Sequence, residues 1–352
     1  MILTSKPSAH VSAVAMAFPE TCVDRETAAN TIELLFPEHE PEFIRSLVER
    51  SGVETRYIVP TLAEVFAPTS FTERNAQYIE AATVLGARAC REALDRARTR
   101  AADIDVVIDV SCTGIAIPAL DVALSPLLGL RANVRRIPIT ESGCAAGALA
   151  LGLAATLAQA GMRVLVVAVE LCSLTMVRGD RSRTNLIASV LFGDGAAAAV
   201  VLPGGPGPRI EAVGSHLIPG TSATMGFHIG DHGLQIVLQR ELPSVLVEHL
   251  PAAQQTFLRE HGRTAADIGL HLIHPGGRRV LEAYSAMHAL RHEDLRFSRE
   301  SLRRYGNLSS ASVLSVLELA LAAKVTVPPE KDAFLMAIGP GLSLEMMLLR
   351  WS

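Results

Sequence analysis

The chain repeats one set of landmarks in each of its two halves, and this repeat limits the possible folds more than any other feature. In chain order the landmarks are an Ala-Asp-Ile triplet before an apolar run (102–104 and 266–268), a stretch of small residues with helical character (143–158 and 306–322) and a Gly-X-Gly turn before a strand (193–195 and 339–341). Asp103 and Asp267 are 164 residues apart (267 − 103), and Cys144 and Asn307 are 163 apart (307 − 144). The third pair has an offset of 146. The order predicts an internal duplication, with chance similarity between two α/β halves as the alternative.

We expect each half to be a sheet with helices, so the predicted fold class is α/β with two halves related by a pseudo-twofold axis. The 352 residues, 49% of them hydrophobic and 19% charged, suffice for a large core. The run PGGPGP at 203–208 is the predicted boundary, which divides the chain into halves 1–205 and 206–352. The pseudo-twofold axis would bring the N-termini of the two small-residue helices together, so Cys144 and Asn307 would face one cleft.

Hydrophobic patterns predict the main elements. A helix is expected over 24–52, with Asp24 as its N-cap and Gly52 at its end. Further predictions are a helix over 73–98 and strands over 8–18, 106–110, 163–169 and the later part of 191–202. The stretch 145–160 is apolar, but it is short for a membrane span and rich in small residues, which favours a tightly packed core helix.

Charge and composition exclude several classes of function. The net charge is −4, the aromatic content is 4%, and there is no basic run, so general binding of nucleic acid or of an anionic membrane is not expected. The five cysteines are odd in number and widely spaced, and no CxxC or Cys/His ligand pair occurs. This pattern predicts reduced thiols in a cytoplasmic protein without a metal site. The N-terminus lacks the features of a signal peptide.

Cys144 is the candidate nucleophile. It stands at the start of a small-residue helix, where backbone N–H groups and the helix dipole lower the pKa of a thiol. Gly143 and Ala145 leave room beside the sulfur. The alternative is that Cys144 is a small buried core residue, as most free cysteines are.

His274 and Asn307 complete a possible reactive group. His274 ends the apolar run LHLI and precedes Pro-Gly-Gly, and Asn307 opens the second small-residue helix. Taken singly, His274 could be a hydrogen-bonded core histidine and Asn307 a helix cap. Their place in equivalent loops of the repeat argues for a joint role with Cys144.

The chain resembles the type III polyketide synthases, the chalcone synthase-like branch of the thiolase and ketosynthase superfamily, over its whole length and is most similar to bacterial members. The resemblance rests on ESGCAAG at 141–147, LFGDGAA at 191–197, HPGG at 274–277, YGNLSSASVL at 305–314 and GPGLSLE at 339–345. It implies a thiolase-like fold of αβαβα layers built from two duplicated halves. The β-ketoacyl-carrier-protein synthases III share the cysteine, histidine and asparagine, but HPGG and GPGLSLE resemble the polyketide synthases.

The resemblance implies a mechanism. Cys144, as a thiolate paired with His274, would accept an acyl starter from a coenzyme A or carrier-protein thioester. His274 and Asn307 would then donate hydrogen bonds to the thioester oxygen of malonyl-CoA while it loses CO₂. The enolate would extend the chain on Cys144, and a cyclised product of pyrone, resorcinol or naphthol type is expected. This chemistry requires no metal and no resident cofactor.

The resemblance also assigns substrate-binding residues. Phe192 matches a gatekeeping phenylalanine, and Ile236 stands where a second gatekeeping aromatic is expected, which should widen the passage. The other cavity residues implied are Cys112, Thr113, Cys172, Thr175, Ser309, Gly339 and Pro340. Cys112 could be a second reactive thiol, although a small wall residue is the preferred interpretation.

Partners follow from the same comparison. Arg50, and less directly Arg45, correspond to basic residues that bind the phosphates of coenzyme A, and they would serve a carrier protein's phosphopantetheine arm equally well. Arg56 has the same possible role. A homodimer is expected, with the loop at Ile117, usually Met in the family, reaching the partner's cavity.

Three other functions remain open from the residues alone. The first is a ketosynthase III-like enzyme that performs one condensation, possibly on carrier-protein substrates. The second is a Cys/His hydrolase, although its local signatures are missing around Cys144 and His274. The third is a non-catalytic binding protein, which would be expected to lack at least one of the three residues.

Overall fold

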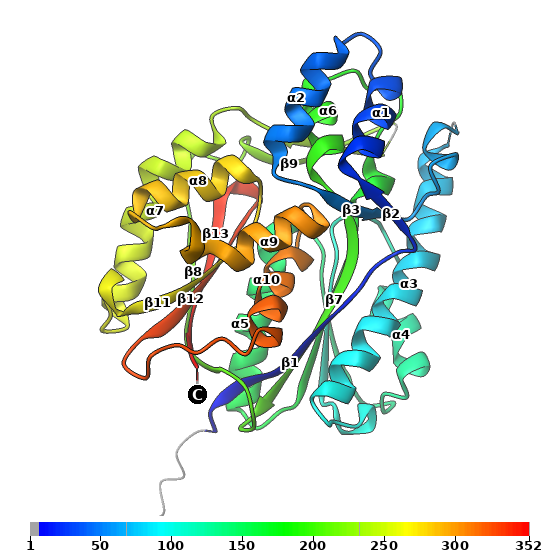
Figure 1. The fold of residues 1–352 in the computed structure, drawn as a ribbon. Helices are drawn as coiled ribbons and strands as arrows, with labels where there is room; N and C mark the ends of the chain where they lie inside the picture. Colours follow the sequence, from blue (N-terminus) through cyan, green and yellow to red (C-terminus); the bar gives the residue numbers. More distant parts are fainter. Residues whose placement is uncertain (1–6, 68, 232, 352) are drawn as a thin grey trace, which may run out of the picture.

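The computed structural model describes residues 7–67, 69–231 and 233–351. Its main feature is a nine-stranded sheet with the strand order β11-β12-β13-β8-β1-β7-β6-β4-β5 (Figure 1). The first half contributes β1 (Ala9–Ala17), β4 (Val106–Val110), β5 (Arg135–Ile139), β6 (Val164–Leu171) and β7 (Asp194–Pro203). The second half contributes β8 (Arg209–Leu217), β11 (Ile268–Ile273), β12 (Asp332–Gly339) and β13 (Ser343–Arg350).

The strand order shows the repeat directly. In the first half β1 pairs antiparallel with β7, β7 antiparallel with β6, and β6 parallel with β4. In the second half β8, β13, β12 and β11 pair in the same order and directions. Within the described ranges, strand pairing joins the two half-sheets only between β1 and β8, at Ala9↔Ile210 and His10↔Arg209. The predicted duplication is therefore present in the fold.

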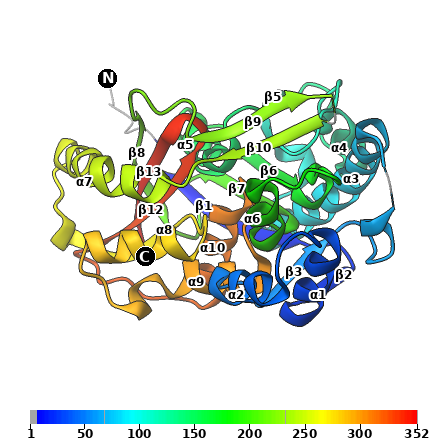
Figure 2. The same ribbon diagram turned by 90° about the horizontal axis from the view of Figure 1, so that it is seen from above.

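Helices cover the two half-sheets in layers (Figures 1 and 2). The central layer holds α5 (Ala146–Gln159) and α10 (Ala311–Ala322), which contact each other and strands of both half-sheets. The outer helices are α3 (Phe71–Arg96) and α4 (Leu120–Leu128) on the first half-sheet, and α7 (Leu242–Glu260) and α8 (Arg278–Met287) on the second. The result is helix, sheet, helix, sheet and helix, which confirms the predicted αβαβα arrangement.

Small residues in the central layer allow the two helices to approach closely. A Cβ atom added at Gly147 of α5 would lie 2.1 Å from the carbonyl oxygen of Ser310, which precedes α10. The apolar side chains of α5 pack between the two half-sheets, so this helix has no polar face. No described helix has the length and apolar character that crossing a membrane requires.

The single helix predicted over 24–52 is wrong, because the structure forms two helices there. Asp24 does cap α1 (Arg25–Leu35), where its side chain accepts a hydrogen bond from the backbone N–H of Thr27, and Gly52 ends α2 (Pro41–Ser51) with a φ of 81°. The break is caused by prolines at 37 and 41, because proline lacks the N–H that a helix interior needs. Pro41 is the first residue of α2, a position where the missing N–H costs no intrahelical hydrogen bond.

The other predicted elements are confirmed within about two residues, with one exception. The second small-residue helix is predicted over 306–322, but α10 begins only at Ala311, so Asn307 lies in the turn before the helix and does not open it. A smaller group of elements stands above the sheet (Figure 1), and several residues of this group line the cavity described below. It includes α1, α2, β2 (Thr21–Asp24), β3 (Thr55–Ile58), α6 (Arg183–Leu191), β9 (Met225–Gly230) and β10 (Gly233–Leu238). One more helix, α9 (Arg296–Tyr305), leads into the second central helix.

Candidate active site

The two halves bring Cys144, His274 and Asn307 to one small chamber. Cys144 lies in a 3₁₀ turn, Gly143–Ala145, directly before α5. His274 follows the last residue of β11, and Asn307 lies between α9 and α10. All three line a chamber of about 40 Å³ together with Phe192. The sequence prediction that Cys144 and Asn307 face one cleft therefore agrees with the structure.

The surroundings of Cys144 favour the protonated form of its thiol. Burial raises the pKa of Cys144 to about 12, and the hydrogen bond with Ser309 only partly offsets this effect. Its Sγ lies 3.5 Å from Ser309 Oγ, the one hydrogen-bond contact of this sulfur recorded within the described residues. The expectation that the helix start lowers the thiol pKa is wrong, because loss of solvation outweighs the helix dipole at this depth.

His274 is neutral as well. It is 2% exposed, and burial lowers its pKa to about 4. Its backbone N–H donates to the Met336 carbonyl oxygen at 2.8 Å, which fixes the end of β11 against β12. Within the described residues its Nδ1 has no hydrogen-bond partner. The two pKa shifts favour a protonated Cys144 and a neutral His274, whereas the sequence analysis expects Cys144 as a thiolate paired with His274.

Asn307 is held through both its backbone and its side chain. Its N–H donates to the Leu191 carbonyl oxygen at 2.9 Å, and its own carbonyl oxygen accepts from the N–H of Gly193 at 3.1 Å. Its side-chain Nδ2 lies 3.4 Å from the carbonyl oxygen of Gly276. The gatekeeping segment around Phe192 and the chamber are thus tied together by main-chain hydrogen bonds.

A buried carboxyl group, which sequence analysis missed, stands behind the cysteines. Glu170 on β6 is fully buried, and burial raises its pKa. It accepts hydrogen bonds from Thr113 Oγ1 at 2.7 Å and Cys112 Sγ at 3.4 Å, and also from the hydroxyl of Ser310. The available signal was a single acidic residue in an otherwise apolar strand, because a buried acid requires several partners.

Ser309 connects the two cysteines. Its Oγ lies 3.3 Å from Cys112 Sγ and 3.5 Å from Cys144 Sγ. Burial, followed by the nearby Glu170, raises the pKa of Cys112 well above its usual value. Cys112 is therefore a protonated wall residue in this structure.

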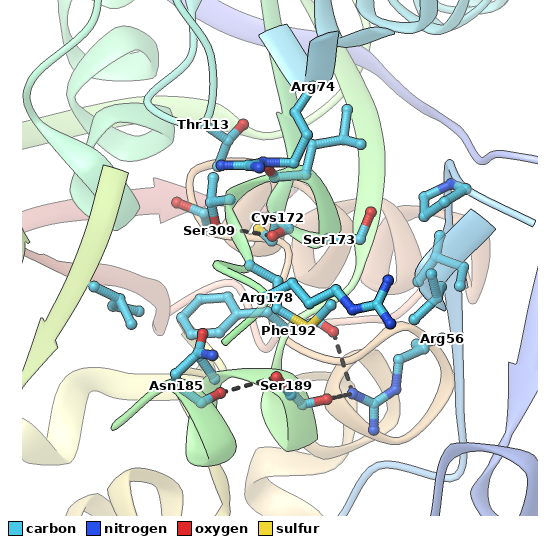
Figure 3. A pocket seen from close by; sticks show the side chains of 18 of the residues that line it. Arg56, Arg74, Thr113, Cys172, Ser173, Arg178, Asn185, Ser189, Phe192 and Ser309 are labelled. Atoms are coloured by element: carbon cyan, nitrogen blue, oxygen red, sulfur yellow. Dashed lines mark hydrogen bonds between the residues drawn. The ribbon is translucent and has the colours of Figure 1, made fainter. Parts of the chain in front are cut away.

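A larger cavity of about 360 Å³ is lined by both Cys144 and Phe192. Figure 3 shows Phe192 among the side chains that line it. Most of the predicted substrate-binding residues line it: Phe192, Ile236, Cys112, Thr113, Cys172, Thr175, Ser309 and Pro340. Gly339 is not among the lining residues. A Cβ there would lie 2.6 Å from Ala145 Cβ, so this glycine is needed for packing beneath the cysteine turn, not for contact with substrate.

The passage keeps an aromatic ring in spite of Ile236. Phe227 on β9 pairs directly with Ile236 on β10, and both line the cavity. Residues directly opposite each other in antiparallel strands share one face of the ribbon. Ile236 alone is therefore a poor guide to the width of the passage, because a neighbouring strand supplies the ring. The sequence signal for Phe227 is the alternation of apolar residues Met225, Phe227 and Ile229 along its strand.

The predicted phosphate-binding arginines lie apart from the cavity. Arg45 pairs with Glu33 at 2.8 Å and also contacts Asn30, and Arg50 is exposed in the last turn of α2. Neither lines the cavity or the chamber. Their binding to coenzyme A stays a prediction.

Arg56 does line the cavity, but its guanidinium serves the fold. It donates to the carbonyl oxygens of Ser189 at 2.6 Å and Phe192 at 3.3 Å (Figure 3). Burial lowers its pKa to about 10, while the neighbouring Asp194 opposes this shift. Arg56 therefore holds the C-terminal end of α6 and the gatekeeping segment in place.

Among the described residues, no group of three or more His, Cys, Asp or Glu side chains has a geometry that could hold a metal ion.

The duplicated five-layer fold, with a cysteine, a histidine and an asparagine at the junction of its halves, defines a condensing enzyme of the thiolase fold. Comparison with known proteins gives the family. The models of the N-terminal and C-terminal domains of chalcone and stilbene synthases match residues 1–206 and 209–351. The chain belongs to this family and is a type III polyketide synthase.

Similar proteins span nearly the whole chain. A 1,3,6,8-tetrahydroxynaphthalene synthase from Streptomyces peucetius subsp. caesius is 37% identical, over 94% of this chain and 95% of that protein. A putative chalcone synthase from Bacillus subtilis is 30% identical, over 97% and 99%. The crystal structure of the tetrahydroxynaphthalene synthase from Streptomyces coelicolor, a bacterial type III polyketide synthase, superimposes with a TM-score of 0.93 at 33% identity, over 97% and 99% of the two chains.

Proposed function

We propose that this polyketide synthase carries the growing chain on Cys144 and uses His274 and Asn307 to decarboxylate malonyl-CoA. The observation that supports this proposal is that the three side chains line one chamber, and that Cys144 and Phe192 line both this chamber and a larger cavity. The chamber offers one sulfur nucleophile and two groups that can donate N–H hydrogen bonds, which is what decarboxylative condensation needs.

Loading begins from a neutral pair. Cys144 Sγ attacks the carbonyl carbon of the starter thioester, and its proton passes to a ring nitrogen of His274. The bond from carbon to the sulfur of coenzyme A breaks, and the departing thiolate takes a proton as it leaves. The acyl group then remains on Cys144, and His274 returns to its neutral state, which its lowered pKa favours.

Extension follows when a malonyl thioester occupies the chamber. The bond to the carboxylate breaks, CO₂ leaves, and the electron pair forms an enolate whose oxygen accepts N–H hydrogen bonds from His274 and Asn307. The enolate carbon attacks the acyl carbon on Cys144, a carbon–carbon bond forms, and the sulfur is released as the leaving group. No redox change occurs, so the proposal includes no resident cofactor.

A naphthol-type product is the proposed outcome. Two of the similar proteins described above are 1,3,6,8-tetrahydroxynaphthalene synthases. The cavity of about 360 Å³ has mostly apolar walls and can hold a folded chain before it cyclises. Pyrone or resorcinol products, and a single β-ketoacyl product, are the other outcomes that an assay would distinguish.

Mass spectrometry of products tests this function. The protein is incubated with malonyl-CoA alone, and then with malonyl-CoA and a panel of short- and long-chain acyl-CoA starters. Ring products that contain three or more malonyl-derived units support the proposal. A single β-ketoacyl product would support the ketosynthase III-like alternative, and hydrolysis of acyl-CoA without extension would contradict both.

A homodimer is part of the proposal. Ile117 is 93% exposed, and further exposed apolar residues lie on α3, on α4 and in the loop between β4 and α4. They are Ile79, Val84, Ile115, Val122 and Leu127. Covering so many apolar side chains favours association with a second copy. Light scattering that shows a stable monomer at micromolar concentration would contradict this expectation.

The five cysteines are all free thiols, which fits the proposed cytoplasmic location.

A further inference from the structure

The two ends of the Asn307 side-chain amide differ in chemistry, and only the NH₂ end can donate a hydrogen bond to an enolate oxygen. The following inference rests on the proposed function, in which this donation lowers the barrier to decarboxylation. The contacts of Asn307 determine which end faces the chamber.

The oxygen end of the amide is identified by its partners. Asn307 Oδ1 lies 2.8 Å from the backbone N–H of Ser309 and 3.1 Å from Ser312 Oγ. A backbone N–H can only donate, so the atom facing it must be an acceptor. Nδ2 therefore points the other way, toward the carbonyl oxygen of Gly276, on the side where Asn307 lines the chamber with Cys144 and His274.

Ser312 is built to donate to this oxygen. It lies in the first turn of α10 and is fully buried. Its Oγ accepts a hydrogen bond from the backbone N–H of Leu308 at 2.7 Å. A hydroxyl group has a single hydrogen and two lone pairs. Because the Leu308 N–H donates to a lone pair of Ser312 Oγ, the hydroxyl hydrogen is directed to Asn307 Oδ1. Ser312 thus links the backbone N–H of Leu308, the residue after Asn307, to the side chain of Asn307.

We propose that Ser312 is a positioning residue for decarboxylation, which acts by holding the Asn307 amide with its N–H hydrogens toward the thioester oxygen of malonyl-CoA. It does not contact the substrate itself, because it does not line the chamber or the larger cavity. A group fixed before the reaction spends no energy on reorientation at the transition state. Loss of Ser312 should therefore slow decarboxylation and leave binding of malonyl-CoA unchanged.

The chain offers a matched control one turn further along the same helix. Ser315 is also fully buried, and its hydroxyl bonds the Ser312 carbonyl oxygen at 2.7 Å and Ser301 Oγ at 2.5 Å. It has no recorded hydrogen bond to Asn307 among the described residues. Ser312→Ala and Ser315→Ala each remove one buried hydroxyl from α10, but only the first removes a partner of the amide.

The experiment measures steady-state conversion of malonyl-CoA to acetyl-CoA, with the active enzyme counted by acylation of Cys144 in intact-protein mass spectra. Ser312→Ala should lower kcat about 3- to 10-fold, the value of one hydrogen bond, and leave KM within about twofold. Ser315→Ala should leave both parameters within about twofold. Ser312→Cys keeps the side-chain size but is a weak donor, so it should lower kcat in the same direction with an intact core.

A double-mutant cycle tests whether Ser312 acts through Asn307. In the Asn307→Ala background, Ser312→Ala should cause no further loss of decarboxylation. A further loss of equal size, or equal losses in Ser312→Ala and Ser315→Ala, would overturn the inference. A wild-type protein that does not decarboxylate malonyl-CoA would contradict the proposed function. An impaired Asn307→Ala with an unaffected Ser312→Ala would contradict the positioning role alone.

Discussion

The starts of the two central helices occupy equivalent places in the repeat, yet they are built for different tasks. Each reactive residue follows a glycine with positive φ: Gly143 at 50° precedes Cys144, and Gly306 at 70° precedes Asn307. Cys144 Sγ then has one recorded contact, with Ser309, whereas Asn307 has two backbone and three side-chain hydrogen bonds. One turn presents a nucleophile that must form and break bonds, and the other presents a fixed donor.

The largest expected effect on activity is that of replacing Cys144, which lies in the turn with fewer hydrogen bonds. Cys144→Ala should abolish chain extension, because Cys144 is the one thiol or hydroxyl side chain among the described residues that line the chamber. Decarboxylation of malonyl-CoA should continue, because His274 and Asn307 are unchanged. Product analysis and acetyl-CoA formation measure the two steps separately. Ring products from this variant would disprove the assignment of the nucleophile.

Replacing Asn307, in the turn with more hydrogen bonds, should impair decarboxylation and leave acylation of Cys144 intact. Asn307→Ala should lower the rate of decarboxylation by roughly 10²–10³-fold, as loss of one donor at a developing oxyanion does. Cys144 should still be acylated by a starter acyl-CoA in intact-protein mass spectra. An unchanged decarboxylation rate would show that Asn307 takes no part in the mechanism. The proposed difference between the two turns would then be wrong as well.

His274 after β11 and Cys112 after β4 form a second pair of residues at equivalent places in the repeat. They should differ in how they affect the pH dependence of stability. Burial lowers the pKa of His274 to about 4, against about 6.5 in an unfolded chain. Between these values the unfolded state binds a proton that the folded state does not, so stability is complete above about pH 6.5 and is lost as the pH falls toward 4. The expected cost is ~1.4 kcal/mol per pH unit in the middle of this range.

Urea unfolding at a series of pH values measures this slope. His274→Gln should reduce the slope, while His271, whose pKa burial also lowers to about 4, continues to contribute in both proteins. Cys112→Ser should leave the slope unchanged, because the thiol stays protonated throughout. Equal slopes in wild type and His274→Gln would show that His274 does not titrate as described.

The smallest expected effect is that of Cys112→Ser on catalysis. Cys112 is a protonated wall residue between Glu170 and Ser309, so decarboxylation should stay within about threefold of wild type. The distribution of products could still change, because the residue lines the cavity. A loss as large as that of Asn307→Ala would make Cys112 a second reactive thiol.

Sequence reasoning found the features that depend on order along the chain. The duplication is visible as repeated landmarks, and the repeat alone placed Cys144 and Asn307 in one cleft. Long motifs such as HPGG supplied His274 and the family. These features could be predicted because they depend on residue identity and spacing along the chain, which the sequence itself contains.

Features that depend on the three-dimensional surroundings of a residue could not be predicted from the sequence. The direction of the Cys144 pKa shift depends on how much water reaches the sulfur, which a helix-start rule does not contain. Phe227 replaces a missing ring from the opposite strand, so it is found only when the register with Ile236 is known. Gly339 belongs to a recognised motif, but its small size serves contact with Ala145, which lies almost 200 residues away in sequence.

The pairing of Phe192 with Asn307 sets how the enzyme can adapt to new substrates. The two residues form an isolated parallel bridge, framed by the hydrogen bonds of Asn307 to Leu191 and Gly193. A bulky starter can turn the Phe192 ring, but it cannot displace the main chain there without moving the amide that decarboxylation uses. Changes in substrate range should therefore arise by exchanging side chains around a stationary frame, and insertions or deletions in this segment should be tolerated poorly.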